Sequence, residues 1–168
     1  HKYKKAIDLI SARGIVQGYT DNTFRPDEHV KRGELLKIVM EQNYPDLKPT
    51  SCFTDVTPDL WFSKYACKAK ELEIAQGYPD GSFRGGQDVA FVEALKIMQL
   101  AYDLEFSPST DGPWYKKSVE YASTLNIIPL DTFSFGQKLT RAQMADMLAR
   151  LFTYREGTLD AYLGVNRE

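Results

Sequence analysis

A loop motif occurs twice in this chain at a fixed spacing, and this repeat constrains the fold more than any other feature. Residues 18–25 read GYTDNTFR and residues 77–84 read GYPDGSFR. The helix-like segments that follow the two loops keep the same register, so that Glu34 corresponds to Glu93. A fixed period of this kind is typical of repeat architectures, and the fold and function are therefore best derived per repeat.

A third copy of the repeat is present in shortened form. The aromatic segment at residues 53–74 recurs at residues 106–127, with Trp114 in the place of Trp61. The third loop, at residues 129–133, is shorter than the other two and lacks the Gly-Tyr pair. The chain therefore contains three related but unequal copies.

The copies define the expected domain boundaries. Counting back one period from Trp61 reaches Lys2, so the first copy lacks its front, and we expect the chain to be part of a longer protein. The expected units are a first repeat at residues 1–47, a second at 48–105, a third at 106–154, and an exit segment or linker at 155–168.

Each repeat is predicted to be a helix, a loop and a second helix. Phe62, Tyr65 and Ala66 recur at spacings of three and four, which lines one helical face with apolar groups. We expect the second helix of the same repeat to cover this face. One repeat cannot bury all of its apolar surface alone, whereas three stacked or bundled copies can.

The predicted fold class is therefore all-α, with three helix-loop-helix repeats around a shared core. The inner helices, packed against one another at the centre, are expected near residues 32–43, 91–102 and 141–153. The outer helices are expected around them, near residues 3–13, 61–73 and 114–125.

The loops and helix starts carry local signals. Gly81, and Asn22 in the first copy, suit a turn position with positive φ. Thr140 and Gln143 form the pattern of a capping box. The first two copies have Lys31 and Ala90 at the cap instead, so their helix starts are expected to be weaker or to shift to Asp27 and Asp88. We expect the loop phenylalanines to plug each repeat: Phe24, Phe83 and Phe133.

Composition narrows the functional classes. A net charge of −2 over 168 residues argues against nucleic acid or an anionic membrane surface as the main partner. No apolar run approaches the length of about 18 residues that a membrane helix needs. His1 and His29 are isolated, and no metal, cofactor or catalytic constellation is predicted.

The loop at residues 77–83 and the helix start at residues 139–143 resemble the repeats of the S-layer homology family. Members carry an aromatic first helix, a Gly-Tyr-Pro-Asp-Gly-Thr-Phe-like loop and an Ile-Thr-Arg-Ala-Glu-like helix start. The resemblance covers roughly residues 1–153. It implies a pseudo-threefold bundle, an extracellular cell-surface location, and the anchoring of S-layer proteins or surface enzymes to a cell-wall polysaccharide or peptidoglycan.

The resemblance also implies where a glycan binds, namely in grooves between repeats, where the motif arginine meets the glycine-rich loop. A guanidinium group binds a carboxylate through two parallel hydrogen bonds, and glycine lets backbone N–H groups approach an anion. The candidate ligand-binding residues are Arg32, Arg141, Gly18, Asp21, Gly77, Tyr78, Asp80, Gly81, Trp61 and Trp114. Phe91 stands where the second repeat should have its arginine, so we expect at most one or two competent grooves, with that of the second copy apolar or structural. Because the grooves join neighbouring repeats, the alternative is that the intact second loop meets a retained arginine, Arg32 or Arg141, across a repeat boundary.

Several alternatives stay open at this stage. The two arginines can equally be first-turn residues paired with a neighbouring acid, and Trp61 and Trp114 either fill the core or stack on sugars. Asp21 and Asp80 are expected to form turns rather than contact a ligand. Because export permits disulfides, Cys52 and Cys67 are either a bridge or a free buried pair.

Two functions follow as hypotheses. The first is a non-catalytic module that binds a wall glycan. The second is a structural domain whose repeats pack in a surface lattice through self-association, with glycan binding lost.

Overall fold

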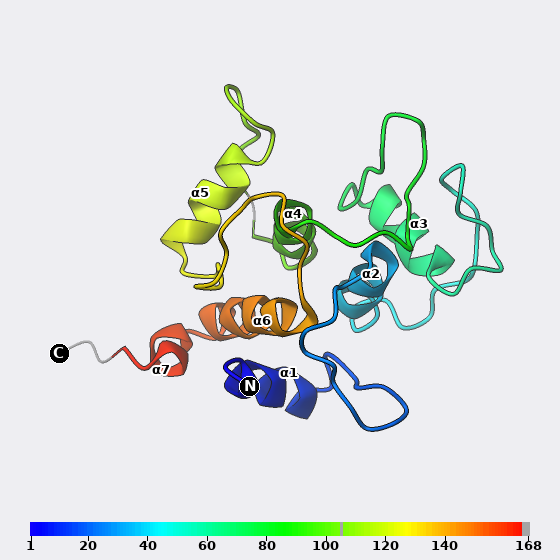
Figure 1. Cartoon of the computed structure of the whole chain (residues 1–168). Helices are drawn as coiled ribbons and strands as arrows, with labels where there is room; N and C mark the ends of the chain where they lie inside the picture. Colours follow the sequence, from blue (N-terminus) through cyan, green and yellow to red (C-terminus); the bar gives the residue numbers. More distant parts are fainter. Residues whose placement is uncertain (105, 166–168) are drawn as a thin grey trace.

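The protein is helical throughout the part of the chain that the computed structural model describes, residues 1–104 and 106–165 (Figure 1). No strand longer than an isolated bridge occurs in this part, which confirms the all-α prediction. None of the helices described there is long and apolar enough to cross a membrane. The helices are α1 (Lys4–Ala12), α2 (Arg32–Met40), α3 (Ser63–Glu71), α4 (Phe91–Ala101), α5 (Lys116–Thr124), α6 (Arg141–Arg155) and α7 (Leu159–Leu163).

The helix pairs form between repeats and not within them. The outer helix α3 packs on α2 of the preceding repeat, α5 packs on α4, and α1 closes the ring by packing on α6 (Figure 1). The expectation that each outer helix is covered by the inner helix of its own repeat was therefore wrong. The loop between them takes that place, since its Phe83 lies against Phe62 with ring centroids 6.0 Å apart.

A closed ring of backbone hydrogen bonds marks the centre of the molecule. Val30 N–H donates to the carbonyl of Leu139, Leu139 to Val89, and Val89 to Val30, over 2.9, 3.0 and 2.9 Å. The three residues are pseudo-equivalent, and all are buried. This ring gives the fold a pseudo-threefold axis and fixes the three repeats against one another.

The unpaired backbone N–H groups at the start of each inner helix donate hydrogen bonds to the loop of another repeat. Arg32 N–H donates to the carbonyl of Gln87 over 2.9 Å, and Phe91 N–H donates to that of Gln137 over 2.8 Å. These carbonyls replace the missing side-chain caps, because they accept from N–H groups that a helix leaves unpaired. The expected shift of the helix starts to Asp27 and Asp88 was therefore wrong.

The start of the third inner helix has both a side-chain cap and a carbonyl acceptor from another repeat. The capping box of Thr140 and Gln143 is confirmed, with reciprocal hydrogen bonds of 3.1 and 3.0 Å. In addition, Arg141 N–H donates to the carbonyl of Glu28 over 2.8 Å. The first loop is thereby joined to the third repeat, which completes the cycle.

The loop phenylalanines differ between the repeats. Phe83 is fully buried, and Phe24 packs partly buried against the core. Phe133 is 88% exposed, so the prediction that it plugs its repeat was wrong. The third loop lacks the Gly-Tyr turn that folds the other two loops back onto the helices. Of the predicted exit segment, residues 159–163 form α7, and residues 166–168 lie outside the described residues.

Candidate functional site

Two related cavities lie at equivalent boundaries between repeats. Groove 1 has a volume of about 380 Å³ and is open to solvent between the first loop, α2 and the segment that enters α3. Groove 2, of about 290 Å³, has the same position one repeat further on. Groove 1 is lined by Gly14, Ile15, Val16, Gln17, Gly18, Tyr19, Glu34, Lys37, Ile38, Glu41, Trp61 and Arg141. Groove 2 is lined by Arg32, Ile74, Ala75, Gln76, Gly77, Tyr78, Glu93, Lys96, Ile97 and Trp114.

Each groove takes its motif arginine from another repeat. Arg141 of the third repeat lies at the first loop, where its Nε donates to the carbonyl of Phe24 over 2.8 Å. Arg32 of the first repeat lies at the second loop, where its Nε donates to the carbonyl of Phe83 over 2.9 Å. The two arginines are buried because their start-of-helix positions are docked on the neighbouring loop.

The loop tyrosines lie between two arginines. The Arg25 guanidinium is 3.7 Å from the ring centroid of Tyr19, and that of Arg141 is 4.8 Å away. In groove 2, Arg84 and Arg32 lie 3.9 and 4.9 Å from the ring of Tyr78. Cation–π attraction therefore joins loop and arginine at both boundaries.

The arginines also face acids, which supports the hypothesis that they pair with a neighbouring carboxylate. Arg32 is hydrogen bonded to Glu93. The equivalent pair in groove 1 is Arg141 and Glu34. Arg141 Nη1 is 3.8 Å from Oε2 of Glu34, which is too far for a hydrogen bond. Burial raises the pKa of Glu34, against the opposing effect of the Arg141 charge.

The two tryptophans form the outer walls of the grooves. Trp61 is 55% exposed in groove 1 and Trp114 is 52% exposed in groove 2, so the interpretation that they fill the core was wrong. In groove 2 the ammonium of Lys96 lies 5.3 Å from the ring of Trp114. An exposed indole face opposite a buried arginine offers both an apolar and a cationic wall.

The remaining candidate residues divide between the grooves and the loop turns. Gly18 lines groove 1, and Gly77 and Tyr78 line groove 2. A Cβ at Gly77 would lie 2.6 Å from the carbonyl oxygen of Ser82, and φ there is +75°, so close packing of the loop itself requires glycine.

Asp21 and Asp80 lie inside the turns, as expected. Asp80 accepts from the backbone N–H and the hydroxyl of Ser82 over 2.9 and 2.6 Å, and Asp21 accepts likewise from Thr23. The hydrogen bond from the Ser82 hydroxyl is the main cause that lowers the pKa of Asp80 to about 2. Gly81 follows with a φ of +83°, and neither aspartate lines a groove.

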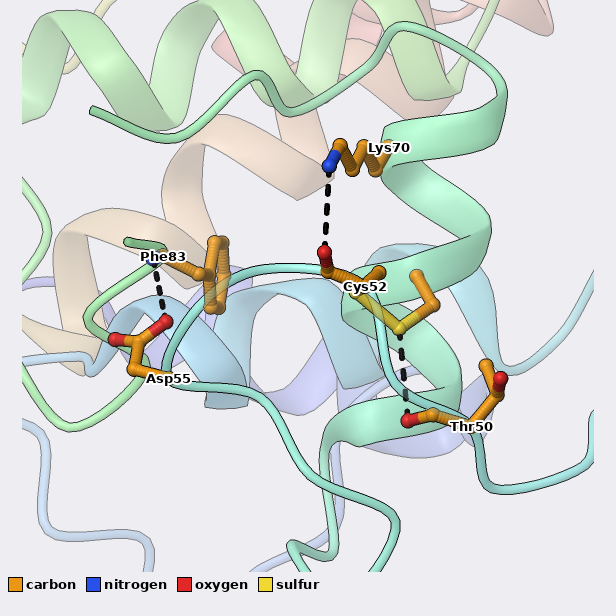
Figure 2. The surroundings of a disulfide bond; sticks show 6 residues. Thr50, Cys52, Asp55, Lys70 and Phe83 are labelled. Carbon is orange, nitrogen blue, oxygen red and sulfur yellow. Dashed lines mark hydrogen bonds between the residues drawn. A yellow bond between two sulfur atoms is a disulfide. The ribbon is translucent and has the colours of Figure 1, made fainter. Parts of the chain in front are cut away.

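A disulfide joins Cys52 to Cys67 on α3 and lies beside the second loop (Figure 2). Just after Cys52, the Asp55 carboxylate accepts from the N–H groups of Phe83 and Arg84 over 2.7 and 2.8 Å. The free-pair alternative is therefore wrong. The bridge holds the segment that clamps the loop of groove 2.

The third boundary is built differently. Phe91 is buried at the arginine position, and it faces the third loop, so the second loop keeps an arginine partner in Arg32. Groove 2, at the second loop, is lined by Arg32, Glu93 and Lys96 and is not the apolar groove that we expected there, and Phe91 is not among the residues that line groove 3. Groove 3, of about 390 Å³, is lined by Lys2, Tyr3, Lys5, Ala6, Leu130, Asp131, Phe133, Asp146, Arg150, Tyr162 and Leu163.

Charged residues of the inner helices also line the grooves, which was not predicted from the sequence. Glu34, Lys37 and Glu41 all line groove 1, and Glu93 and Lys96 line groove 2. Their spacing of three and four places them on one helical face. Glu34 and its equivalent Glu93 begin this register, and both were already aligned by the repeat spacing.

The fold is a repeat-built module with two related open grooves. Residues 1–36 and 53–90 match the sequence profile of the S-layer homology domain. The middle cell wall protein of Brevibacillus brevis and the surface layer protein of Brevibacillus choshinensis are each 30% identical over 129 residues, which is 74% of this chain. A cellulosome-anchoring protein of Acetivibrio thermocellus is 32% identical over 100 residues, or 56% of the chain and 20% of that protein.

The chain belongs to the S-layer homology domain family. It is an extracellular module of the cell surface, and the domain is a non-catalytic one that anchors proteins to the cell wall. The chain spans only 12% and 11% of the lengths of the two Brevibacillus relatives.

Proposed function

We propose that this module anchors its parent protein by binding a cell-wall glycan, either a secondary wall polymer or peptidoglycan, in grooves 1 and 2. One observation carries the proposal. Two pseudo-equivalent grooves each combine a buried arginine from another repeat with a half-exposed tryptophan. Core packing explains neither the exposure of the indoles nor their recurrence.

The groove chemistry suits a sugar chain. An indole offers a flat apolar face on which a sugar ring stacks and an N–H that donates a hydrogen bond. Lys37 in groove 1 and Lys96 in groove 2 add cations that have no acidic partner among the described residues. Acidic substituents of a wall polymer therefore meet positive charge next to an apolar wall.

Retention on isolated cell walls tests the proposal. Trp61→Ala and Trp114→Ala should each lower the retained fraction, and the double variant should lower it most, because each removes the wall of one groove. Phe133→Ala is the matched control, since it removes an exposed aromatic outside both grooves. Equal retention of the double variant and the unaltered protein, with both folded, would refute glycan binding in these grooves.

Replacement of both motif arginines is the complementary test. Arg32→Ala with Arg141→Ala should abolish retention, but each arginine also holds a loop carbonyl, so circular dichroism must show a folded protein first.

Assembly in a surface lattice is the second candidate. It is favoured by the third loop, where Leu130 and Phe133 are 89% and 88% exposed. Sedimentation at rising protein concentration should then show self-association that Phe133→Ser removes. A monomer at all concentrations would exclude it for this chain.

A further inference from the structure

The three pairs of outer and inner helices differ in how the chain connects their members. Residues 41–62 join α2 to α3, and residues 102–115 join α4 to α5. The third pair consists of α6 and α1, which are far apart in the sequence, so no direct connection joins them. A short connection keeps two helices at a high effective concentration. The pair that closes the ring therefore lacks a support that the other two pairs have.

Residues 156–165, which follow α6 and include α7, lie beside α1 at this third pair (Figure 1). We call this segment the strap. Near the start of α1, Lys5 Nζ donates to the carbonyl of Tyr162, and the same ammonium is 4.8 Å from the ring centroid of Tyr162. Just after α1, the Arg13 guanidinium binds the Glu156 carboxylate through two hydrogen bonds, one of them 2.9 Å long. The strap therefore contacts α1 at both of its ends.

The strap also binds α6 through a buried carboxylate. The Tyr162 hydroxyl donates to Oδ1 of Asp146 over 3.0 Å, and Arg150 Nε donates to Oδ2 of Asp146 over 2.8 Å. Asp146 and Arg150 are buried, and so is Leu159 of the strap. Burial, and then the charge of Asp146, raises the pKa of Tyr162, so the hydroxyl stays protonated and donates. Release of the strap would leave Oδ1 of a buried acid without this donor, which is unfavourable.

The acceptor for the strap is specific to the third boundary. By the repeat spacing, Asp146 corresponds to Lys37 in groove 1 and Lys96 in groove 2. An ammonium group has donors only, so neither lysine accepts a hydrogen bond from a tyrosine. The residue that binds the strap is thus present at the one boundary where the helix pair lacks a direct connection.

The helical conformation of the strap depends on its docking. α7 has five residues, far fewer than the roughly 12 that an isolated helix needs in water. The contacts with α1 and α6 therefore hold it in shape. Protection of its backbone amides from hydrogen exchange reports whether the strap is docked.

We infer that the strap takes the place of the missing connection at the third boundary. By binding α1 and α6 together, it holds the first repeat on the third and keeps the ring closed. Its release loosens α1 before the rest of the fold. This role is independent of what binds in grooves 1 and 2.

Hydrogen exchange measured by NMR tests this inference on the full chain. Leu159→Asp with Tyr162→Ala should undock the strap, because it removes an apolar contact and the donor to Asp146 and leaves every residue of α1 and α6 unaltered. Residues 156–165 should lose protection, and the amides of α1 should exchange about tenfold faster. The amides of α3 and α4, which lie outside the third pair, should keep their rates.

Two single variants complete the design. Tyr162→Phe removes only the hydroxyl and should raise the exchange rates of α1 by less than the double variant does. Tyr154→Ala is the control, since it removes an exposed tyrosine of α6 and should leave the exchange of α1 unchanged.

Three results would overturn the inference. The first is an unprotected strap in the unaltered protein. The second is unchanged exchange of α1 when the strap of the double variant has lost its protection. The third is equal acceleration in α1, α3 and α4, because it would make residues 156–165 part of the common core instead of a strap on one boundary.

Discussion

Equivalent residues of the three repeats have different structural roles. Phe83 is fully buried, where it stacks with Phe53 at 5.2 Å between ring centroids, whereas Phe133 at the equivalent position is exposed. The same divergence affects the motif position, where Arg32 and Arg141 hold loop carbonyls and Phe91 is part of the core. Each substitution must therefore be judged at its own repeat.

Truncation of the two phenylalanines should have unequal effects. Phe83→Ala should lower the free energy of unfolding by about 3–5 kcal/mol, because a large buried ring leaves a cavity. Phe133→Ala should change it by less than about 0.5 kcal/mol, as exposed positions do. Urea unfolding monitored by circular dichroism measures both. Equal losses would contradict the different burial of the two rings.

The loop aspartates make stability depend on pH in acid. The pKa of Asp80 is about 2 when folded against an ordinary value of 3.8, mainly because the Ser82 hydroxyl donates to the carboxylate. A lowered pKa stabilises the fold above pH 3.8, and this contribution is lost as the pH falls from 3.8 to about 2. Asp80→Asn should therefore flatten the dependence of the unfolding free energy on pH in that window. Identical slopes for the two proteins would contradict it.

The second loop is held in place by residues that lie outside the loop itself. The second loop is clamped by Asp55, next to the disulfide, and it holds Arg32 of the first repeat (Figure 2). In the described part of the chain the first loop has no such bridge, since both cysteines lie in the second repeat. The disulfide thus supports groove 2 more than groove 1.

Removal of the bridge should separate the two grooves. Cys52→Ser with Cys67→Ser should lower the free energy of unfolding by about 2–4 kcal/mol, the usual value for a loop of this size. In an NMR titration with soluble wall-glycan fragments, the double variant should also show weaker shifts of the Trp114 indole signal than the unaltered protein, with a smaller loss at the Trp61 signal. Equal weakening at both signals would show that the bridge acts on the whole fold alone.

The sequence predicted the elements better than their pairing. Repeat spacing and apolar periodicity located six helices, and the Thr140 capping box was evident from residue types. The packing partner of each helix was not evident from the sequence, because α1 and α6 meet only through ring closure between distant repeats. The location of Phe91 at the third boundary was missed for the same reason, since it depends on which loop each helix start contacts.

At the scale of the whole molecule, the three repeats are one cooperative unit. The hydrogen-bond ring of Val30, Val89 and Leu139 joins all of them at the axis, and α1 closes the cycle on α6. No repeat has its complete set of partners without the other two. The chain therefore differs from an open solenoid, in which terminal repeats unfold separately.

Calorimetry tests this cooperativity. The 168-residue chain should unfold in one transition with an enthalpy of about 120 kcal/mol at its midpoint, and the van't Hoff enthalpy should equal the calorimetric value. Ile10→Ala on α1, which removes a buried side chain at the closure, should lower that single midpoint. Two or more resolved transitions would contradict the closed ring.

We expect a wall glycan to bind where an arginine of one repeat meets the loop of another. The most direct measurement is an NMR titration of the labelled chain with soluble glycan fragments released from cell walls. Saturable shifts should occur at Trp61 and the first loop, and at Trp114 and the second loop, while signals of Leu130 and Phe133 in groove 3 stay unchanged. Shifts confined to groove 3, or to surfaces outside all three grooves, would contradict the claim.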